Sequence, residues 1–112
     1  MEIKSEVHFA DEKQKEAYLA LDTSTFQDKQ LKEWLRRAFE DLERNAFCGI
    51  QIPKRLIPRE YEKKFGTLDN VWKYNLPDAW RLLYTIKRDA IVVLSIVLEW
   101  LPHKEYEKRF NY

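Results

Sequence analysis

A set of side chains that together could do acid–base and phosphate chemistry lies between residues 73 and 106. They are cationic, imidazole and phenol groups on two short runs and a tail: Lys73, Arg81, His103, Lys104 and Tyr106. A lysine, an arginine, a histidine and a tyrosine together are what metal-free cleavage of RNA requires. A base takes the proton from the 2′-hydroxyl, a cation stabilises the charge of the phosphorane, and an acid protonates the leaving 5′ oxygen.

Other kinds of site lack their sequence signatures. The chain has no Gly-rich phosphate-binding loop, no HExxH motif and no CxxC pair. Its two histidines, His8 and His103, are far apart in the sequence and form no metal-ligand pattern. Its one cysteine, Cys48, excludes a disulfide framework and a cysteine-based zinc site. We therefore expect neither a metal nor a cofactor.

Length and composition are those of one folded domain. The chain has 112 residues, of which 45% are hydrophobic and 35% charged. That length supports one hydrophobic core, so we expect a single domain spanning residues 1–112. No run approaches the ~20 apolar residues of a membrane span, and the first residues lack the apolar core of a signal peptide. We expect a cytoplasmic protein with no membrane partner.

The net charge of +1 is unevenly distributed along the chain. Residues 1–49 carry 8 basic and 11 acidic side chains, whereas residues 50–112 carry 12 and 8. The basic side chains of the second half include Lys54, Lys63 and Lys64. This half either attracts phosphate groups or forms an ordinary solvated surface, and the charge counts alone leave both interpretations open.

The first half of the chain is predicted to fold as a strand followed by two helices. Residues 5–9 alternate between polar and apolar types, which predicts a short strand. Residues 10–21 and 26–45 are predicted helices, begun by the N-caps Asp11 and Thr25 and separated by a break at residues 22–24. The apolar positions of the second helix follow helical spacing: Leu31, Trp34, Leu35, Ala38 and Leu42.

The second half changes to a β pattern. Pro53 and Pro58 predict extended chain over residues 50–57 and then a short helix that Gly66 ends. The predicted strands are residues 71–76, 80–87 and 91–100, and a turn at residues 88–90 precedes the last of them. The tail, residues 103–110, is predicted to be helical. Helices packed on one face of an antiparallel sheet make a small α+β domain.

The position of Arg81 relative to Lys73 depends on the register of the hairpin. A loop of two or four residues pairs Lys73 with Tyr84 and puts Arg81 on the opposite face of the sheet. An odd loop length or a β-bulge brings Arg81 to the same face as Lys73. The sequence leaves this register open.

At these residues the sequence resembles the RelE/ParE toxin superfamily. Residues 42–49 (LERNAFCG) resemble the end of that superfamily's second helix. Residues 72–76 (WKYNL) and 80–84 (WRLLY) resemble its central hairpin, and residues 103–106 (HKEY) resemble its closing element. The resemblance covers nearly the whole chain in the predicted order. It is closest to the RelE-type branch, with a long insertion at residues 50–70.

The resemblance implies a toxin of a type II toxin–antitoxin system that cleaves mRNA on the ribosome and is neutralised by a cognate acidic antitoxin. By position, Lys73 and Arg81 match the catalytic lysine and arginine of the hairpin. Tyr106 matches the terminal tyrosine, which would orient the RNA or stack on a base. The basic position of the tail falls at His103 or Lys104.

The sequence departs from the family pattern at Asn75, where RelE-type enzymes often carry a second lysine. The general base is then either Lys73 or His103, and the pair Lys63 and Lys64 could supply the missing charge. The side chains expected to bind substrate are Asn75, Lys104, Lys54, Lys63 and Lys64. Two alternatives remain: a ParE-like toxin that binds a topoisomerase without cutting RNA, and a catalytically degenerate member that binds RNA or a partner.

Overall fold

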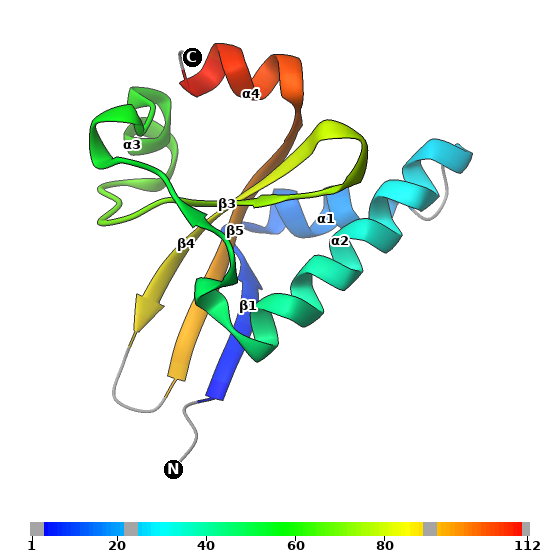
Figure 1. Cartoon of the computed structure of the whole chain (residues 1–112), viewed down its shortest axis with the longest axis horizontal. Helices are drawn as coiled ribbons and strands as arrows, with labels where there is room; N and C mark the ends of the chain where they lie inside the picture. Colours follow the sequence, from blue (N-terminus) through cyan, green and yellow to red (C-terminus); the bar gives the residue numbers. More distant parts are fainter. Residues whose placement is uncertain (1–3, 22–24, 89–91, 111–112) are drawn as a thin grey trace.

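The computed structural model describes residues 4–21, 25–88 and 92–110. The helices and strands, in chain order, are β1 (Lys4–Phe9), α1 (Glu12–Ala20), α2 (Phe26–Arg44), β2 (Ile50–Gln51), α3 (Arg59–Phe65), β3 (Trp72–Asn75), β4 (Trp80–Arg88), β5 (Val92–Pro102) and α4 (His103–Phe110). Within the described ranges five strands form one sheet, in the order β1-β5-β4-β3-β2 (Figure 1). The predicted α+β architecture is confirmed.

The N-terminal helices begin at the caps that the sequence predicts. The Asp11 carboxylate accepts a hydrogen bond of 2.9 Å from the amide of Gln14 at the start of α1. The Thr25 hydroxyl accepts one of 3.2 Å from the amide of Asp28 at the start of α2. Both bonds satisfy amides that no helical carbonyl can reach. The break expected at residues 22–24 lies outside the described residues.

The helix α2 packs its apolar stripe on one face of the sheet. Its buried residues are Leu31, Leu35, Ala38 and Leu42. Trp34 is half-buried at the margin of the same core. The rings of Phe9, Tyr18 and Phe39 extend this core toward α1, with centroid separations of 5.3 to 5.7 Å. The helical period predicted for α2 is confirmed.

The antiparallel pairing expected for the β-meander is confirmed for β3, β4 and β5, but two other expectations about the sheet are wrong. β1 runs parallel to β5, with Val7 opposite Ser95, so the sheet is mixed rather than antiparallel. The residue pattern of a strand shows which face is buried but not which strand is its neighbour, so the direction of pairing is not visible in the sequence. The helices also cover both faces, because α3 and α4 pack on the side opposite α1 and α2.

The segment of residues 50–70 is only partly as predicted. The extended chain expected over residues 50–57 is interrupted by a 3₁₀ turn, η3 (Lys54–Leu56). The fixed φ of Pro53 suits the start of this turn, and the Leu56 amide donates to the Pro53 carbonyl at 2.9 Å. The short helix is confirmed as α3, and it ends at Gly66, whose φ of 78° is left-handed.

A close backbone contact at Gly49 joins the end of α2 to the sheet. A Cβ atom at this position would lie 2.4 Å from the Tyr84 hydroxyl and 2.6 Å from the carbonyl oxygen of Lys73. The Tyr84 hydroxyl accepts a hydrogen bond from the Gly49 amide (3.2 Å) and donates one to the Ala46 carbonyl (2.8 Å). Only glycine lets the two backbones approach this closely, and the contact fixes β3 relative to α2.

The last strands and α4 have the predicted bounds to within two residues. Arg88, the first residue of the turn expected at residues 88–90, is the last residue of β4. The rest of that turn lies outside the described residues. One irregularity interrupts β5: Leu83 pairs with Glu99 and Tyr84 pairs with Val97. Leu98 is therefore the extra residue of a β-bulge, and both Leu98 and Glu99 face α3 and α4.

Candidate functional site

The β3–β4 hairpin carries Lys73, Asn75 and Arg81 on one face. Asn75 pairs with Arg81, and Lys73 pairs with Leu83. The loop that separates Asn75 from Arg81 is residues 76–80, which is an odd length. Because side chains alternate along each strand, this register brings Arg81 to the same face as Lys73. The question that the sequence leaves open is decided here.

The tip of the hairpin is a tight, strained turn, η4 (Pro77–Ala79), whose backbone is not helical. The Leu76 amide donates to the Trp80 carbonyl at 2.9 Å and closes the loop. Asp78 and Ala79 have φ angles of 57° and 62°, a left-handed conformation that side chains with a Cβ atom rarely adopt. Two consecutive left-handed residues reverse the chain tightly, which lets the odd-length loop join the two strands.

The helix α4 lies against this face of the hairpin and contributes the ring of Tyr106. The Nζ atom of Lys73 is 5.2 Å from the ring centroid, and the Cζ atom of Arg81 is 6.0 Å from it. Both cationic side chains are half-buried, and the Arg81 guanidinium also donates to the Trp80 carbonyl at 3.0 Å. Cations at such distances are attracted by the negative face of the ring. The structure thus brings the expected lysine, arginine and tyrosine together.

His103 lies at the first position of α4, at the edge of this group. The preceding residue, Pro102, pairs with Trp80, which precedes Arg81, so α4 starts at the end of the hairpin that carries Arg81. The His103 side chain is 47% exposed, and its Nε2 atom lies 2.5 Å from the Glu107 carboxylate. The imidazole is therefore near the arginine along the sheet but is turned toward solvent and a carboxylate of its own helix.

One role expected for Tyr106 does not fit this arrangement. The side chain is only 2% exposed, because α4 turns it inward against Phe110, with a centroid separation of 4.8 Å. A buried ring is not open to a nucleotide base, so stacking on RNA is excluded for this conformation. What the ring can do is hold the cations of Lys73 and Arg81 close together.

The other lysines expected at the site occupy exposed positions on η3, α3 and α4: Lys54, Lys63, Lys64 and Lys104. Lys64 lines a separate cavity of about 260 Å³ together with Thr85 and Lys87. These two residues lie roughly 13–20 Å along β4 from Arg81, at about 3.3 Å per residue. Lys64 therefore does not supply the charge that Asn75 lacks.

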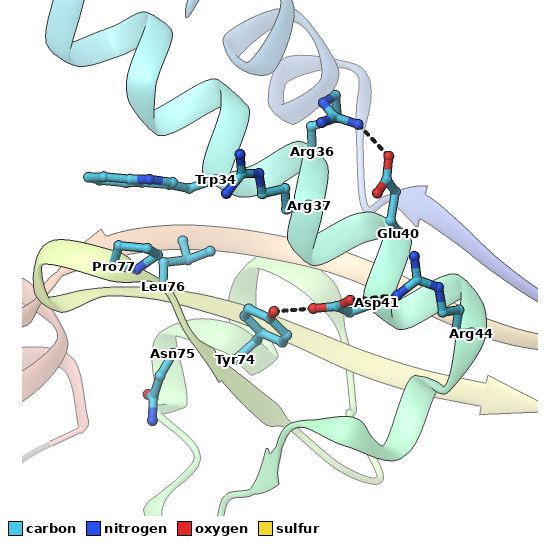
Figure 2. Close-up of a pocket in the computed structure, with 10 residues that line it drawn as sticks. All are labelled: Trp34, Arg36, Arg37, Glu40, Asp41, Arg44, Tyr74, Asn75, Leu76 and Pro77. Atoms are coloured by element: carbon cyan, nitrogen blue, oxygen red, sulfur yellow. Dashed lines mark hydrogen bonds and ion pairs between the residues drawn. The ribbon is translucent and has the colours of Figure 1, made fainter.

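A larger cavity, of about 660 Å³, lies between α2 and the hairpin (Figure 2). Sequence reasoning missed it, although three arginines of α2 line it: Arg36, Arg37 and Arg44. Arg36 pairs with Glu33 at 2.6 Å and also with Glu40. Arg44 pairs with Asp41 at 3.4 Å. These acidic partners three or four residues away are visible in the sequence, and they offset most of the positive charge.

Tyr74 joins the hairpin to α2 inside this larger cavity. Its hydroxyl donates to the Asp41 carboxylate, as Figure 2 shows. Burial, followed by the hydrogen bond and the charge of Asp41, raises the pKa of the Tyr74 phenol to about 12. Tyr74 therefore stays a neutral donor at physiological pH and braces the side of the hairpin opposite Lys73 and Arg81.

Three further features of the described part of the chain concern metal ions, membranes and the cysteine. Among residues 4–21, 25–88 and 92–110, no group of three or more His, Cys, Asp or Glu side chains could hold a metal ion. In the same ranges no helix is long and apolar enough to cross a membrane. Burial and the charge of Asp41 raise the pKa of the Cys48 thiol, which disfavours the reactive thiolate.

The chain matches a known family over most of its length. Residues 10–98 match the model of the family described as ParE toxin of type II toxin-antitoxin system, parDE. The match includes Lys73 and Arg81, and it ends before α4, which carries His103 and Tyr106. No curated protein and no solved structure matches the chain.

Proposed function

Because the chain belongs to the ParE toxin family, and is a toxin of a type II toxin–antitoxin system, we propose that it acts by cleaving mRNA with the Lys73–Arg81–Tyr106 cluster. The observation that carries this proposal is the position of Lys73 and Arg81 on one face of the hairpin, both over one buried ring. Two adjacent cations suit the phosphate of an RNA backbone and the additional negative charge of its transition state.

In the proposed reaction a base removes the proton of the 2′-hydroxyl, the 2′ oxygen attacks the adjacent phosphorus, and the bond to the 5′ oxygen breaks as the protonated base returns that proton to it. Arg81 binds the phosphate and stabilises the charge of the phosphorane. Lys73 is the favoured base because it shares the site with Arg81, whereas His103 is paired with Glu107 and turned toward solvent. The ring of Tyr106 orients both cations, which lie over its face. The proposed reaction uses no metal.

Binding of the RNA strand is assigned to the polar side chains around the cluster. Asn75 is exposed directly opposite Arg81, where its amide can donate to a phosphate or a base. Lys104 is exposed in the first turn of α4, and Lys54 and Lys63 are exposed on the segment packed beside that helix. Such cations contact phosphates and position the strand without reading its sequence. The proposed substrate is mRNA held on the ribosome.

The cognate antitoxin that the family implies is proposed to be acidic and to neutralise these cations. Large apolar side chains are also available to it, since Phe26 is 76% exposed and Phe47 is 50% exposed. Co-expression with the product of the adjacent reading frame is expected to give one complex by size-exclusion chromatography and to restore growth. Separate elution without rescue would contradict this part of the proposal.

The family match favours a second candidate function, binding of a DNA topoisomerase without RNA cleavage. The position of Lys73 beside Arg81 over one tyrosine ring argues for the ribonuclease, because a toxin that only binds needs no proton-transfer group near Arg81. A degenerate member that binds RNA without cutting it is the third possibility. Parallel assays of mRNA cleavage in a translation extract and of DNA supercoiling by gyrase separate the three.

The decisive variant is Arg81→Ala. Loss of a cation that stabilises the transition state is expected to lower the cleavage rate by about 10²–10³-fold, with an unchanged circular dichroism spectrum. The control is Arg88→Ala, an exposed arginine at the far end of the same strand, which should cleave like wild type. Cleavage by Arg81→Ala at the wild-type rate would remove the assignment. Inhibition of supercoiling by a wild-type protein that leaves mRNA intact would favour the topoisomerase reading.

A further inference from the structure

The insertion at residues 50–70 packs directly against α4. Its helix α3 carries Tyr61, which is 2% exposed. The Tyr61 ring meets Phe110 of α4 edge to face, with a centroid separation of 5.7 Å, and it meets Phe65 of its own helix at 5.6 Å. An insertion that is only a surface loop would not contribute one of the most buried aromatic rings of this face.

The carboxylate of Glu99 joins three elements of this face. The β-bulge in β5 turns Glu99 toward α3 and α4 rather than toward α2. Its side chain is only 12% exposed. It accepts hydrogen bonds from the Tyr61 hydroxyl on α3 and from the Arg109 guanidinium on α4, at 3.0 Å to each carboxylate oxygen. Burial raises the pKa of the Tyr61 phenol, so the hydroxyl stays protonated and can donate.

The same arginine also contacts α3 at its surface. The Nε atom of Arg109 lies 3.6 Å from the Glu60 carboxylate, which is 72% exposed. A buried carboxylate that loses its cation is strongly unfavourable, whereas an exposed pair contributes little. We therefore expect Arg109 to hold α4 mainly through Glu99 and only weakly through Glu60.

Ring contacts continue from this carboxylate to the proposed site. Phe110, which touches Tyr61, lies 4.8 Å from Tyr106 between ring centroids. Tyr106 in turn carries Lys73 and Arg81 over its face. Tyr106 and Phe110 are four residues apart on α4, so they share one side of the helix. Any shift of α4 moves the ring on which the cations rest.

The helix α4 needs such an external hold because it is short. It has eight residues, and isolated helices of that length are not stable in water. Its position depends on what it packs against, namely the sheet and α3. Within the described residues, the contact that is both charged and largely buried on this helix is that of Arg109 with Glu99.

We propose that Glu99 is a positioning residue of the Lys73–Arg81–Tyr106 site: with Tyr61 and Arg109 it locks α4 to the insertion and so fixes Tyr106 beneath the two cations. The effect of Glu99 on catalysis rests on the proposed ribonuclease function. The attachment of α4 to the insertion through Glu99 is independent of that function. The insertion then serves as a brace for the site.

The test compares Glu99→Gln with Glu60→Gln in the full-length protein. The first variant removes the buried charge and keeps the shape and an acceptor for Tyr61; the second makes the same change at the exposed partner of the same arginine. Glu99→Gln is expected to accelerate hydrogen exchange of the α4 amides about tenfold or more, with α2 and β4 unchanged. Its kcat for RNA cleavage should fall about tenfold to a hundredfold with KM nearly constant, as for a misplaced catalytic group. Glu60→Gln should leave both at wild-type values.

Three results would overturn the proposal. The first is α4 exchange in Glu99→Gln that equals that of Glu60→Gln. The second is a fall in kcat that matches the unfolded fraction of the variant measured by circular dichroism, because unfolding removes active enzyme and leaves KM unchanged. If Glu99→Gln does not fold, the test uses Tyr61→Phe, which removes one hydroxyl and should show the faster α4 exchange. The third overturning result is α4 exchange in Tyr61→Phe at the wild-type rate. If the wild-type protein cuts no RNA, the proposed function and the effect of Glu99 on catalysis are both overturned. The hydrogen-exchange rates would still show whether Glu99 fixes the position of α4.

Discussion

Arg81 lies directly opposite Asn75 in the β3–β4 hairpin, and this pairing turns the guanidinium toward α4. Lys73, two residues before Asn75, faces the same way and meets the same tyrosine ring. One residue more or fewer in the loop would turn Arg81 toward α2 and separate the two cations by the thickness of the sheet. The loop length, with its two left-handed residues, is thus what creates the cationic pair.

The choice of general base leads to a comparison of two variants. Lys73→Ala is expected to lower the cleavage rate by 10²–10⁴-fold and His103→Ala by less than about tenfold, because only the lysine shares the Tyr106 ring with Arg81. Single-turnover cleavage of a labelled RNA measures both. Lys87→Ala, an exposed lysine of β4, is the control. The reverse order of effects would identify His103 as the base.

Cleavage is expected to need no metal ion. The proposed chemistry uses only the cations and proton-transfer groups of the protein, so chelation should leave the rate unchanged. The assay uses purified toxin, RNA and EDTA without ribosomes, because ribosomes themselves need Mg²⁺. A rate that EDTA abolishes and Mg²⁺ restores would show that the chemistry has been assigned wrongly.

Replacement of Gly66 by alanine should destabilise the protein through the backbone alone. Gly66 has a φ of 78°, and no atom lies within 4 Å of the position that a Cβ atom would take. With ψ at −169°, Gly66 occupies a backbone region that essentially only glycine adopts, and a residue with a Cβ atom there should lose about 1–3 kcal/mol in the free energy of unfolding. Urea denaturation measures it, with Thr67→Ala at the exposed neighbouring position as the control. Equal stabilities of the two variants would mean that the end of α3 can readjust freely.

Stability should fall in strongly alkaline solution, in part through Tyr74. The pKa of its phenol is about 12 in the folded protein and about 10 in an unfolded chain. The folded state therefore holds this proton more tightly, and the resulting stability is complete below pH 10 and is lost as the pH rises through 12. Tyr74→Phe should cost about 1 kcal/mol at pH 8 through the lost bond to Asp41. The difference between the two proteins should shrink between pH 10 and 12 in urea titrations. A constant difference would contradict the raised pKa.

Several elements follow from residues that are close together in the sequence. The stripe from Leu31 to Leu42 predicts α2, because a period of 3.6 residues puts those side chains on one side of a helix. Thr25 and Gly66 predict where helices begin and end, because a cap bond or a left-handed φ is a property of one turn. Membership of the toxin superfamily, expected from three short motifs, is confirmed by the family match.

The tertiary structure alone decides how those elements meet. Four features depend on contacts between residues of different elements: the side on which Arg81 lies, the parallel pairing of β1 with β5, the burial of Tyr106 and the contact between Tyr61 and Glu99. Tyr61 and Glu99 are 38 positions apart, and the residues next to either one in the sequence do not indicate that the two are in contact. Local preferences are fixed by bonds and sterics within a few residues. Strand partners and the docking of helices depend instead on the packing and charge pairing of surfaces that exist only once the chain has folded.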